Sequence, residues 1–156
     1  MCEYCGCQQI AVIGELTREH DALVALISQI KSSIAGEDLE DVANGCQQIS
    51  SLLAPHTLVE EEGLFPEMTE DFPNHIEVLR SEHREIEKAL GEATGCVPDD
   101  PTWPDRLLGT LRLLREHILK EQDGVFPAAL AALDADQWER IESVRAQFGS
   151  ASTTLA

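Results

Sequence analysis

The amino-acid sequence predicts an all-α protein, an up-down-up-down four-helix bundle with a short extra C-terminal helix. Apolar residues recur at alternating spacings of three and four in four successive segments, as they do on one face of a helix. The alternation of apolar and polar residues that marks strands is weak. Clusters of Gly, Pro, Asp and Glu separate the segments, so each helix can end before the next begins.

The four apolar stripes define the four helices in order. They cover residues 13–34, 42–60, 72–90 and 107–121. The clusters that separate them are residues 36–38, 69–73 and 95–104. We expect N-caps at Asp38, Asp71 and Thr102, because a short polar side chain can accept a hydrogen bond from a first-turn amide. A shorter helix over about residues 135–148 can lay Trp138 and Phe148 against the bundle.

The 156 residues, 43% of them hydrophobic, fit one globular domain. We expect residues 10–148 to form the bundle, residues 1–9 to form a cysteine-containing N-terminal arm, and residues 149–156 to be a frayed tail.

The net charge of −18, with only 11 Lys and Arg, argues against nucleic acid or an anionic membrane as a partner, because both attract basic surfaces. No apolar run approaches the roughly 18 residues of a membrane-spanning helix. No secretory signal is visible at the N-terminus. The five cysteines, an odd number without such a signal, predict a reduced, cytoplasmic protein rather than a disulfide framework.

One group of residues occurs twice in the chain. Residues 56–66 are HTLVEEEGLFP and residues 117–127 are HILKEQDGVFP, so both contain His-x-x-x-Glu, then Gly, then Phe-Pro. A further histidine precedes each copy, His20 before the first and His83 before the second. Internal repetition indicates a duplicated structural unit, and the repeated residue types are ligands of transition metals.

Antiparallel helix geometry predicts where these residues meet. In a helical hairpin, two residues equidistant from the turn lie at the same height. Three pairs are each centred on an expected turn: His20 with His56, His83 with His117, and Glu60 with His83. The residues expected to converge at one level of the bundle are His20, His56, Glu60, His83, His117 and Glu121.

Two interpretations of this cluster are open. A histidine on an apolar stripe is usually a hydrogen-bonded core residue, so the cluster could be a structural polar network. Two carboxylates buried without partners would each cost roughly several kcal/mol, however, and a pair of metal cations removes that cost. Residues four apart face the same way on a helix, so His56 with Glu60 and His117 with Glu121 can each clamp a metal. The metal interpretation is favoured.

The order H…HxxxE…H…HxxxE, with Leu/Val-Phe-Pro after each glutamate, resembles the hemerythrin-like family, or HHE cation-binding domain, over roughly residues 10–130. The resemblance implies a four-helix bundle that holds two non-haem irons with an oxo or hydroxo bridge. It implies that Glu60 and Glu121 bridge the two irons. The terminal ligands that it implies are His20, His56, His83 and His117.

Other positions around the implied site differ from or add to the family pattern. Oxygen-carrying hemerythrins have a fifth histidine one turn before that of the third helix, and Leu79 stands there in this chain. His75 lies off the stripe and is expected at the surface. The departure favours sensing, iron handling, or redox chemistry with oxygen, peroxide or nitric oxide over reversible oxygen carriage. Phe65 and Phe126 are expected to close the end of the pocket, or simply to pack in the core.

Glutamates surround the six candidate ligands in the sequence. Glu19, Glu82 and Glu116 each directly precede one of the histidines. They could accept a hydrogen bond from an imidazole on a neighbouring helix, but a solvated helix face is the favoured interpretation. Glu61 and Glu62 are likewise expected to be surface charges.

Cys2, Cys5 and Cys7 form a Cys-x-x-Cys-x-Cys cluster in the N-terminal arm. These thiols could bind zinc or another soft metal or form a reversible disulfide, and a thiol-bearing arm that does neither is the alternative. No fourth ligand for a tetrahedral site is evident nearby. Cys46 lies on a core stripe and is expected to act as a small hydrophobic residue.

The leading functional hypothesis is a cytoplasmic non-haem di-iron protein that binds oxygen, nitric oxide or peroxide for sensing, iron handling or stress response. One alternative is a di-iron oxidoreductase of peroxidase-like, catalase-like or nitric-oxide-handling activity, although no catalytic acid or base can be named. Another is an iron-dependent interaction protein whose thiol arm reports to a protein partner.

Overall fold

A computed structural model of the chain describes residues 10–148. The expected N-terminal arm, with Cys2, Cys5 and Cys7, and the expected tail lie outside these residues. Between residues 10 and 148 the chain forms seven α-helices and two short π-helical turns, without any strand. The predicted all-α class is therefore confirmed. None of the described helices is long and apolar enough to cross a membrane.

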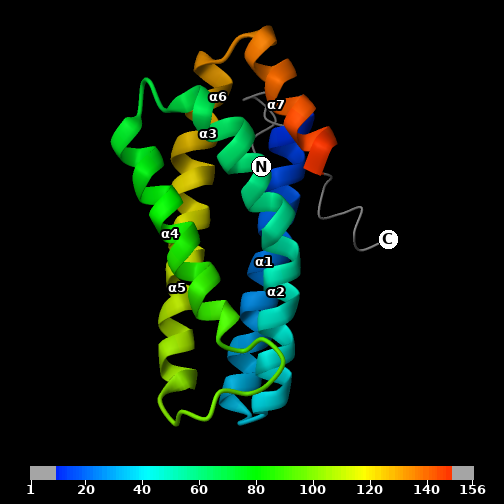
Figure 1. Ribbon diagram of the computed structural model, residues 1–156, viewed down its shortest axis with the longest axis vertical. Helices are drawn as coiled ribbons and strands as arrows, with labels where there is room; N and C mark the ends of the chain where they lie inside the picture. Colours follow the sequence, from blue (N-terminus) through cyan, green and yellow to red (C-terminus); the bar gives the residue numbers. More distant parts are fainter. Residues whose placement is uncertain (1–9, 149–156) are drawn as a thin grey trace.

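Four long helices run along the length of the molecule (Figure 1). They are α1 (Ala11–Ala35), α2 (Leu39–Val59), α4 (Pro73–Gly91) and α5 (Trp103–Lys120). Helix α1 packs against α2, α2 against α4, α4 against α5, and α5 against α1. This circuit of contacts forms a helical bundle, and it places one apolar stripe from each helix in a common core.

The helix starts agree only in part with the expected N-caps. Asp38 precedes α2, and its carboxylate accepts a hydrogen bond from the Asp41 amide at 3.2 Å, as predicted. The expectation for Asp71 was wrong, because Phe72 is the residue before α4 and no side chain caps that helix. Thr102 precedes α5 but does not cap it, because its amide and hydroxyl both donate to the Asp100 carboxylate instead.

Two buried apolar clusters fill the bundle. The first lies toward the α1–α2 turn and includes Leu23, Leu53, Leu114 and Ile118. The second lies toward the other end and includes Phe65, Leu79 and Phe126. Between them the buried residues include histidines and glutamates. The core is therefore interrupted at one level by polar groups.

The second and fourth long helices each continue into a wider turn, which the apolar periodicity did not predict. These π-helical turns are η2 (Glu60–Leu64) and η3 (Glu121–Val125), and the short helices α3 (Phe65–Met68) and α6 (Phe126–Ala132) follow them. The amide of Phe65 donates to the carbonyl of Glu60, and that of Phe126 to the carbonyl of Glu121, five residues back in each case. Pi-helical turns are rare and concentrate at functional sites. Both turns begin at a glutamate of the repeat.

The expected C-terminal helix is present as α7 (Ala135–Phe148). It packs on α2 and η2, and its Ile141 is fully buried. Arg145 of α7 forms ion pairs with Glu15 of α1 and with Glu142. Helix α7 therefore covers the outside of the π-helical turn that follows α2.

The two described cysteines differ in their surroundings. Cys46 is fully buried in the core, and burial raises the pKa of its thiol to about 11. It is therefore an uncharged apolar residue, as predicted. Cys96 is exposed beyond the end of α4.

Candidate metal centre

The six residues predicted to converge do so. The structure contains two groups of four potential ligands whose donor atoms lie within 4.8 Å of one another. The first group is His20, His56, Glu60 and Glu121, and the second is Glu60, His83, His117 and Glu121. Each group thus has two histidines of its own, and both groups share the same two glutamates. The two groups therefore overlap at their carboxylates, and each could hold a metal cation.

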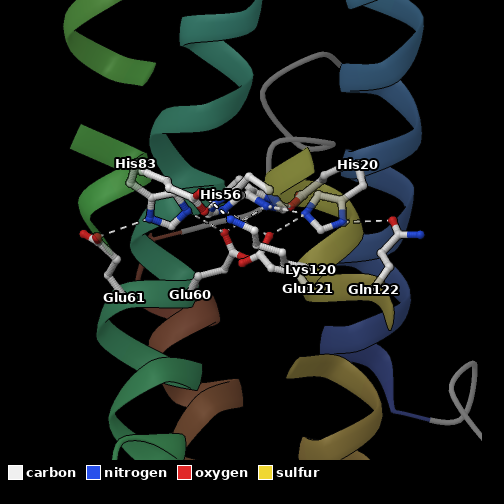
Figure 2. Close-up of polar contacts among 11 residues, drawn as sticks. His20, His56, Glu60, Glu61, His83, Lys120, Glu121 and Gln122 are labelled. Atoms are coloured by element: carbon white, nitrogen blue, oxygen red, sulfur yellow. Dashed lines mark hydrogen bonds and ion pairs between the residues drawn. The ribbon is translucent and has the colours of Figure 1, made fainter. Parts of the chain in front are cut away.

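Each shared glutamate lies between imidazoles of two different helices (Figure 2). Glu60 Oε1 is 3.1 Å from His56 Nε2 and 3.5 Å from His83 Nε2. Glu121 Oε1 is 3.1 Å from His20 Nε2 and 3.3 Å from His117 Nε2. The Nε2 atoms of all four rings therefore point inward, toward the carboxylates.

The donor atoms at the centre face one another without hydrogen bonds of good geometry. The carboxylate oxygens of Glu60 and Glu121 and the Nε2 atoms of His83 and His117 are buried and make no such bond, although the imidazoles and carboxylates lie within ion-pair distance. The Nε2 atoms of His20 and His56 are also only 3.1 Å apart. Burying carboxylates and lone pairs without partners is costly, whereas a cation pair would accept all these lone pairs at once. The donor set of imidazoles and carboxylates suits iron, manganese or zinc.

Protons replace cations in balancing the two carboxylates when no metal is bound. Burial alone would lower the pKa of His56, but the Glu60 carboxylate and a hydrogen bond to Glu19 raise it to about 10. Burial would likewise lower the pKa of His117, but the Glu121 carboxylate raises it to about 9. Burial would raise the pKa of Glu60, but His56 holds it well below its usual value. Metal binding would therefore release protons from this cluster.

The Nδ1 atom of each of the four candidate histidine ligands, on the side of the ring away from the carboxylates, also has a hydrogen-bond partner. His20 Nδ1 lies 2.9 Å from Gln122, His56 Nδ1 lies 2.8 Å from Glu19, His83 Nδ1 lies 3.2 Å from Glu61, and His117 Nδ1 lies 3.1 Å from Glu82. Each partner comes from a different helical element than the ring it contacts. A partner on Nδ1 fixes the orientation and tautomer of the ring, which leaves Nε2 free to bind a metal.

These contacts correct three of the sequence expectations. Glu19 and Glu82 are buried, and Glu61 is partly buried, rather than solvated. A residue next to a ligand points roughly 100° around its helix, and for Glu19, Glu61 and Glu82 that direction is toward an imidazole of a neighbouring helix. Glu62 and Glu116 are exposed, as expected. Gln122 was not among the predicted site residues, although it follows Glu121 as Glu61 follows Glu60.

The phenylalanines of the repeat lie against the histidines. Phe126 stacks on His20 with the ring centroids 5.4 Å apart, and Phe65 stacks on His83 at 5.7 Å. In an unbroken helix a residue nine positions after His56 would lie about 180° away from it. The π-helical turn absorbs an extra residue and turns Phe65 back toward the centre. The two turns therefore place both a carboxylate and an aromatic wall at the cluster.

One space adjoins the cluster and a second lies at the surface. The first is a narrow gap without room for a water-sized molecule; it lies beside the four histidines and Glu60 and is otherwise lined by Leu23, Leu53, Leu114 and Ile118. A larger surface hollow of about 620 Å³ lies between α4 and the η3–α6 segment, and its lining includes Leu79 and Lys120. Leu79 is 2% exposed and lies one turn before His83, where the family's oxygen carriers were expected to have a histidine. His75 is exposed at the rim, as predicted.

The fold and the site define a class: helical proteins with a buried cluster of histidines and carboxylates that can hold metal cations. The family model for the hemerythrin HHE cation-binding domain matches residues 11–129, and the chain belongs to this family.

Similarity beyond the family is distant. A DNA nickase from Nostoc sp. (strain PCC 7120 / SAG 25.82 / UTEX 2576) is 22% identical over 134 residues, which is 85% of this chain. The chain spans only 37% of that protein's length. No solved structure gives a significant match.

Proposed function

We propose that the protein is a non-haem di-iron protein of the up-down-up-down hemerythrin type. His20 and His56 would hold one iron, and His83 and His117 would hold the other. Glu60 and Glu121 would bridge the two, and an oxo or hydroxo group would complete the bridge. The observation that carries this proposal is that both groups of potential ligands share the same two carboxylates.

The iron pair would supply an open coordination position and one-electron redox chemistry. The chain's own residues restrict what reaches it. The narrow gap beside the histidines has four aliphatic side chains around it and offers no hydrogen-bond donor besides the candidate ligands. The gap has no room for a water-sized molecule, so side chains must shift to admit any ligand. The close apolar lining therefore favours a very small ligand, and we propose oxygen, nitric oxide or peroxide. Sensing, iron handling and stress response are functions that such a ligand serves.

We propose a cytoplasmic protein that does not bind nucleic acid. The net charge of −18 supports this, because a polyanion repels the phosphate backbone. The similarity to a DNA nickase does not weigh strongly against it, because this chain covers barely more than a third of that protein.

Metal analysis and spectroscopy of the purified chain test the proposal. After anaerobic loading with ferrous iron and removal of the excess, we expect two irons per chain and, after oxidation, the visible absorption of a bridged ferric pair. One iron or none per chain would contradict it. Turnover of hydrogen peroxide by the loaded protein would distinguish the alternative, a di-iron oxidoreductase, from a binding or interaction protein.

A further inference from the structure

The two halves of the centre correspond residue by residue except in their outer contacts. Each half supplies a Glu-His pair from one helix, then a histidine, then a glutamate four residues later. The residue after that glutamate differs between the halves: it is Glu61 in the first and Gln122 in the second.

Glu61 and Gln122 occupy equivalent places on opposite sides of the cluster (Figure 2). Glu61 Oε1 is 3.2 Å from Nδ1 of His83, and Gln122 Oε1 is 2.9 Å from Nδ1 of His20. In each case the Nε2 atom of the same ring faces a shared carboxylate. An imidazole of one half is thus held by a carboxylate, and its counterpart by a neutral amide.

The remaining outer contacts do not remove this difference. His56 and His117 both have a carboxylate on Nδ1, from Glu19 and Glu82. The imidazoles of the second metal position are thus held by two carboxylates, and those of the first by one carboxylate and one amide. Lys120 pairs with Glu82 at 2.5 Å and offsets part of its charge. The difference between the positions therefore rests on Glu61 and Gln122, the acceptors for His83 and His20.

We propose that Gln122 and Glu61 make the two metal positions inequivalent, so that the iron beside His20 and His56 is reduced before the iron beside His83 and His117. This inference rests on the proposed di-iron function. Reduction takes one electron at each iron, from Fe(III) to Fe(II), supplied by an electrode through small-molecule mediators.

The physical basis is the strength of the acceptor on Nδ1. A carboxylate draws the Nδ1 proton toward itself, which makes the imidazole a stronger donor at Nε2 and adds negative charge near the metal. Both effects stabilise Fe(III) over Fe(II). An amide oxygen orients the ring equally well but adds no charge. Gln122 and Glu61 are therefore positioning residues that tune the two irons differently without contacting them.

Two single exchanges and their combination test the inference. Gln122→Glu gives both positions two carboxylates, and Glu61→Gln gives both one carboxylate and one amide. We expect two separate reduction steps in the unchanged protein and closer steps in either single variant. The equilibrium constant for forming the mixed-valent state should fall roughly 10- to 100-fold, the range by which outer contacts change metal affinity. The double variant Glu61→Gln/Gln122→Glu keeps the net charge and should again show two separate steps.

Glu62→Gln is the matched control, because it removes the same charge one position away on an exposed face. It should leave both reduction steps in place. Mössbauer spectra of the fully reduced protein give an independent readout, with two iron environments in the unchanged protein and more similar ones in each single variant. If Gln122→Glu does not hold two irons, Glu61→Gln makes the same comparison.

The outcomes separate this inference from the proposed function. Fewer than two irons per chain in the unchanged protein would overturn the proposed function and the inference with it. Two bound irons with the same separation of reduction steps in all variants, or a larger effect from Glu62→Gln, would overturn the inference alone.

Discussion

Glu19 on α1 and His56 on α2 are joined by a buried hydrogen bond of 2.8 Å between Oε1 and Nδ1. The contact ties two helices together at the height of the candidate metals. It also holds the imidazole with Nε2 toward Glu60, 3.1 Å away. Glu19, which is not a candidate ligand, therefore sets the orientation of His56, which is.

We predict that Glu19→Ala weakens metal binding by roughly 10- to 100-fold, because the ring of His56 loses its orienting acceptor. Stepwise titration of the metal-free protein with ferrous iron or zinc measures the affinity. Glu116→Ala is the control, because Glu116 also directly precedes a candidate ligand but is exposed. Equal affinities for both variants would show that the contact to His56 is unimportant.

The shared carboxylates are predicted to be required for two metals. Glu60→Ala or Glu121→Ala should reduce the metal content from two ions per chain to one or none, because each carboxylate faces both positions. Elemental analysis after anaerobic loading measures this. Glu62→Ala, on the exposed side of the same turn, should bind two. A variant without Glu60 that still binds two metals would contradict the bridging role.

Removal of the metals should make the stability of the protein depend on pH. The pKa values of His56 and His117 are raised from 6.5 to about 10 and about 9 in the folded protein. A histidine whose pKa is higher in the folded protein stabilises the fold fully at pH values below its pKa in the unfolded chain. That stabilisation is lost as the pH rises through its pKa in the folded protein. The Glu60 pKa is lowered from 4.5, so its contribution is lost as the pH falls below that value.

The metal-free protein should therefore be most stable between about pH 4.5 and 6.5 and should lose stability toward pH 10. Urea unfolding at a series of pH values measures the free energy of unfolding. The metal-loaded protein is the comparison, because coordinated imidazoles carry no proton at Nε2, and its stability should change less across the same range. A metal-free protein that gains stability above pH 7 would contradict the prediction.

Leu79 is predicted to keep a coordination position open. Leu79→His places an imidazole one turn before His83, and this imidazole should occupy that position. Azide should then bind more weakly than to the unchanged protein, as followed by its charge-transfer absorption on the ferric centre. Leu79→Met, which keeps an apolar side chain of similar volume, is the control. If Leu79→His left the azide affinity unchanged while Leu79→Met lowered it, the position at Leu79 would not be open.

Substitution of two glycines tests the helix packing at a distance from the candidate metal centre. A Cβ atom at Gly45 of α2 would lie 2.5 Å from Cγ1 of the buried Ile30 of α1. Gly45→Ala should therefore lower the free energy of unfolding by about 1–3 kcal/mol. A Cβ at Gly109 of α5 would meet nothing within 4 Å, so Gly109→Ala should stabilise the helix by about 0.5–1 kcal/mol. Thermal unfolding of the metal-loaded protein measures both, and effects of the same sign would contradict this packing.

Helix periodicity and antiparallel symmetry were sufficient to predict most of the fold and the convergence of the candidate ligands. The midpoints of His20 with His56 and of His83 with His117 fall in turns that were located independently of the histidines. Residues four apart on one helix must share a face, so the pairing of each histidine with its glutamate required no tertiary information.

The π-helical turns and the outer contacts were not predictable in the same way. A regular periodicity of 3.6 residues does not reveal where a single extra residue enters a turn, although the repeated Glu-x-x-Gly followed by Phe-Pro marks the place. Glu19, Glu61 and Glu82 were assigned to solvent because one helix alone shows only that they leave its apolar stripe.

The sequence by itself therefore determined the helical class, the level of the cluster and the identity of its six central residues, because these follow from spacing along single helices. Only the tertiary structure decided that Glu19 faces His56, and that Gln122 faces His20 where Glu61 faces His83. Those pairings depend on how each helix is rotated against its neighbour. That rotation is set by side-chain packing across the whole core, which no local pattern encodes.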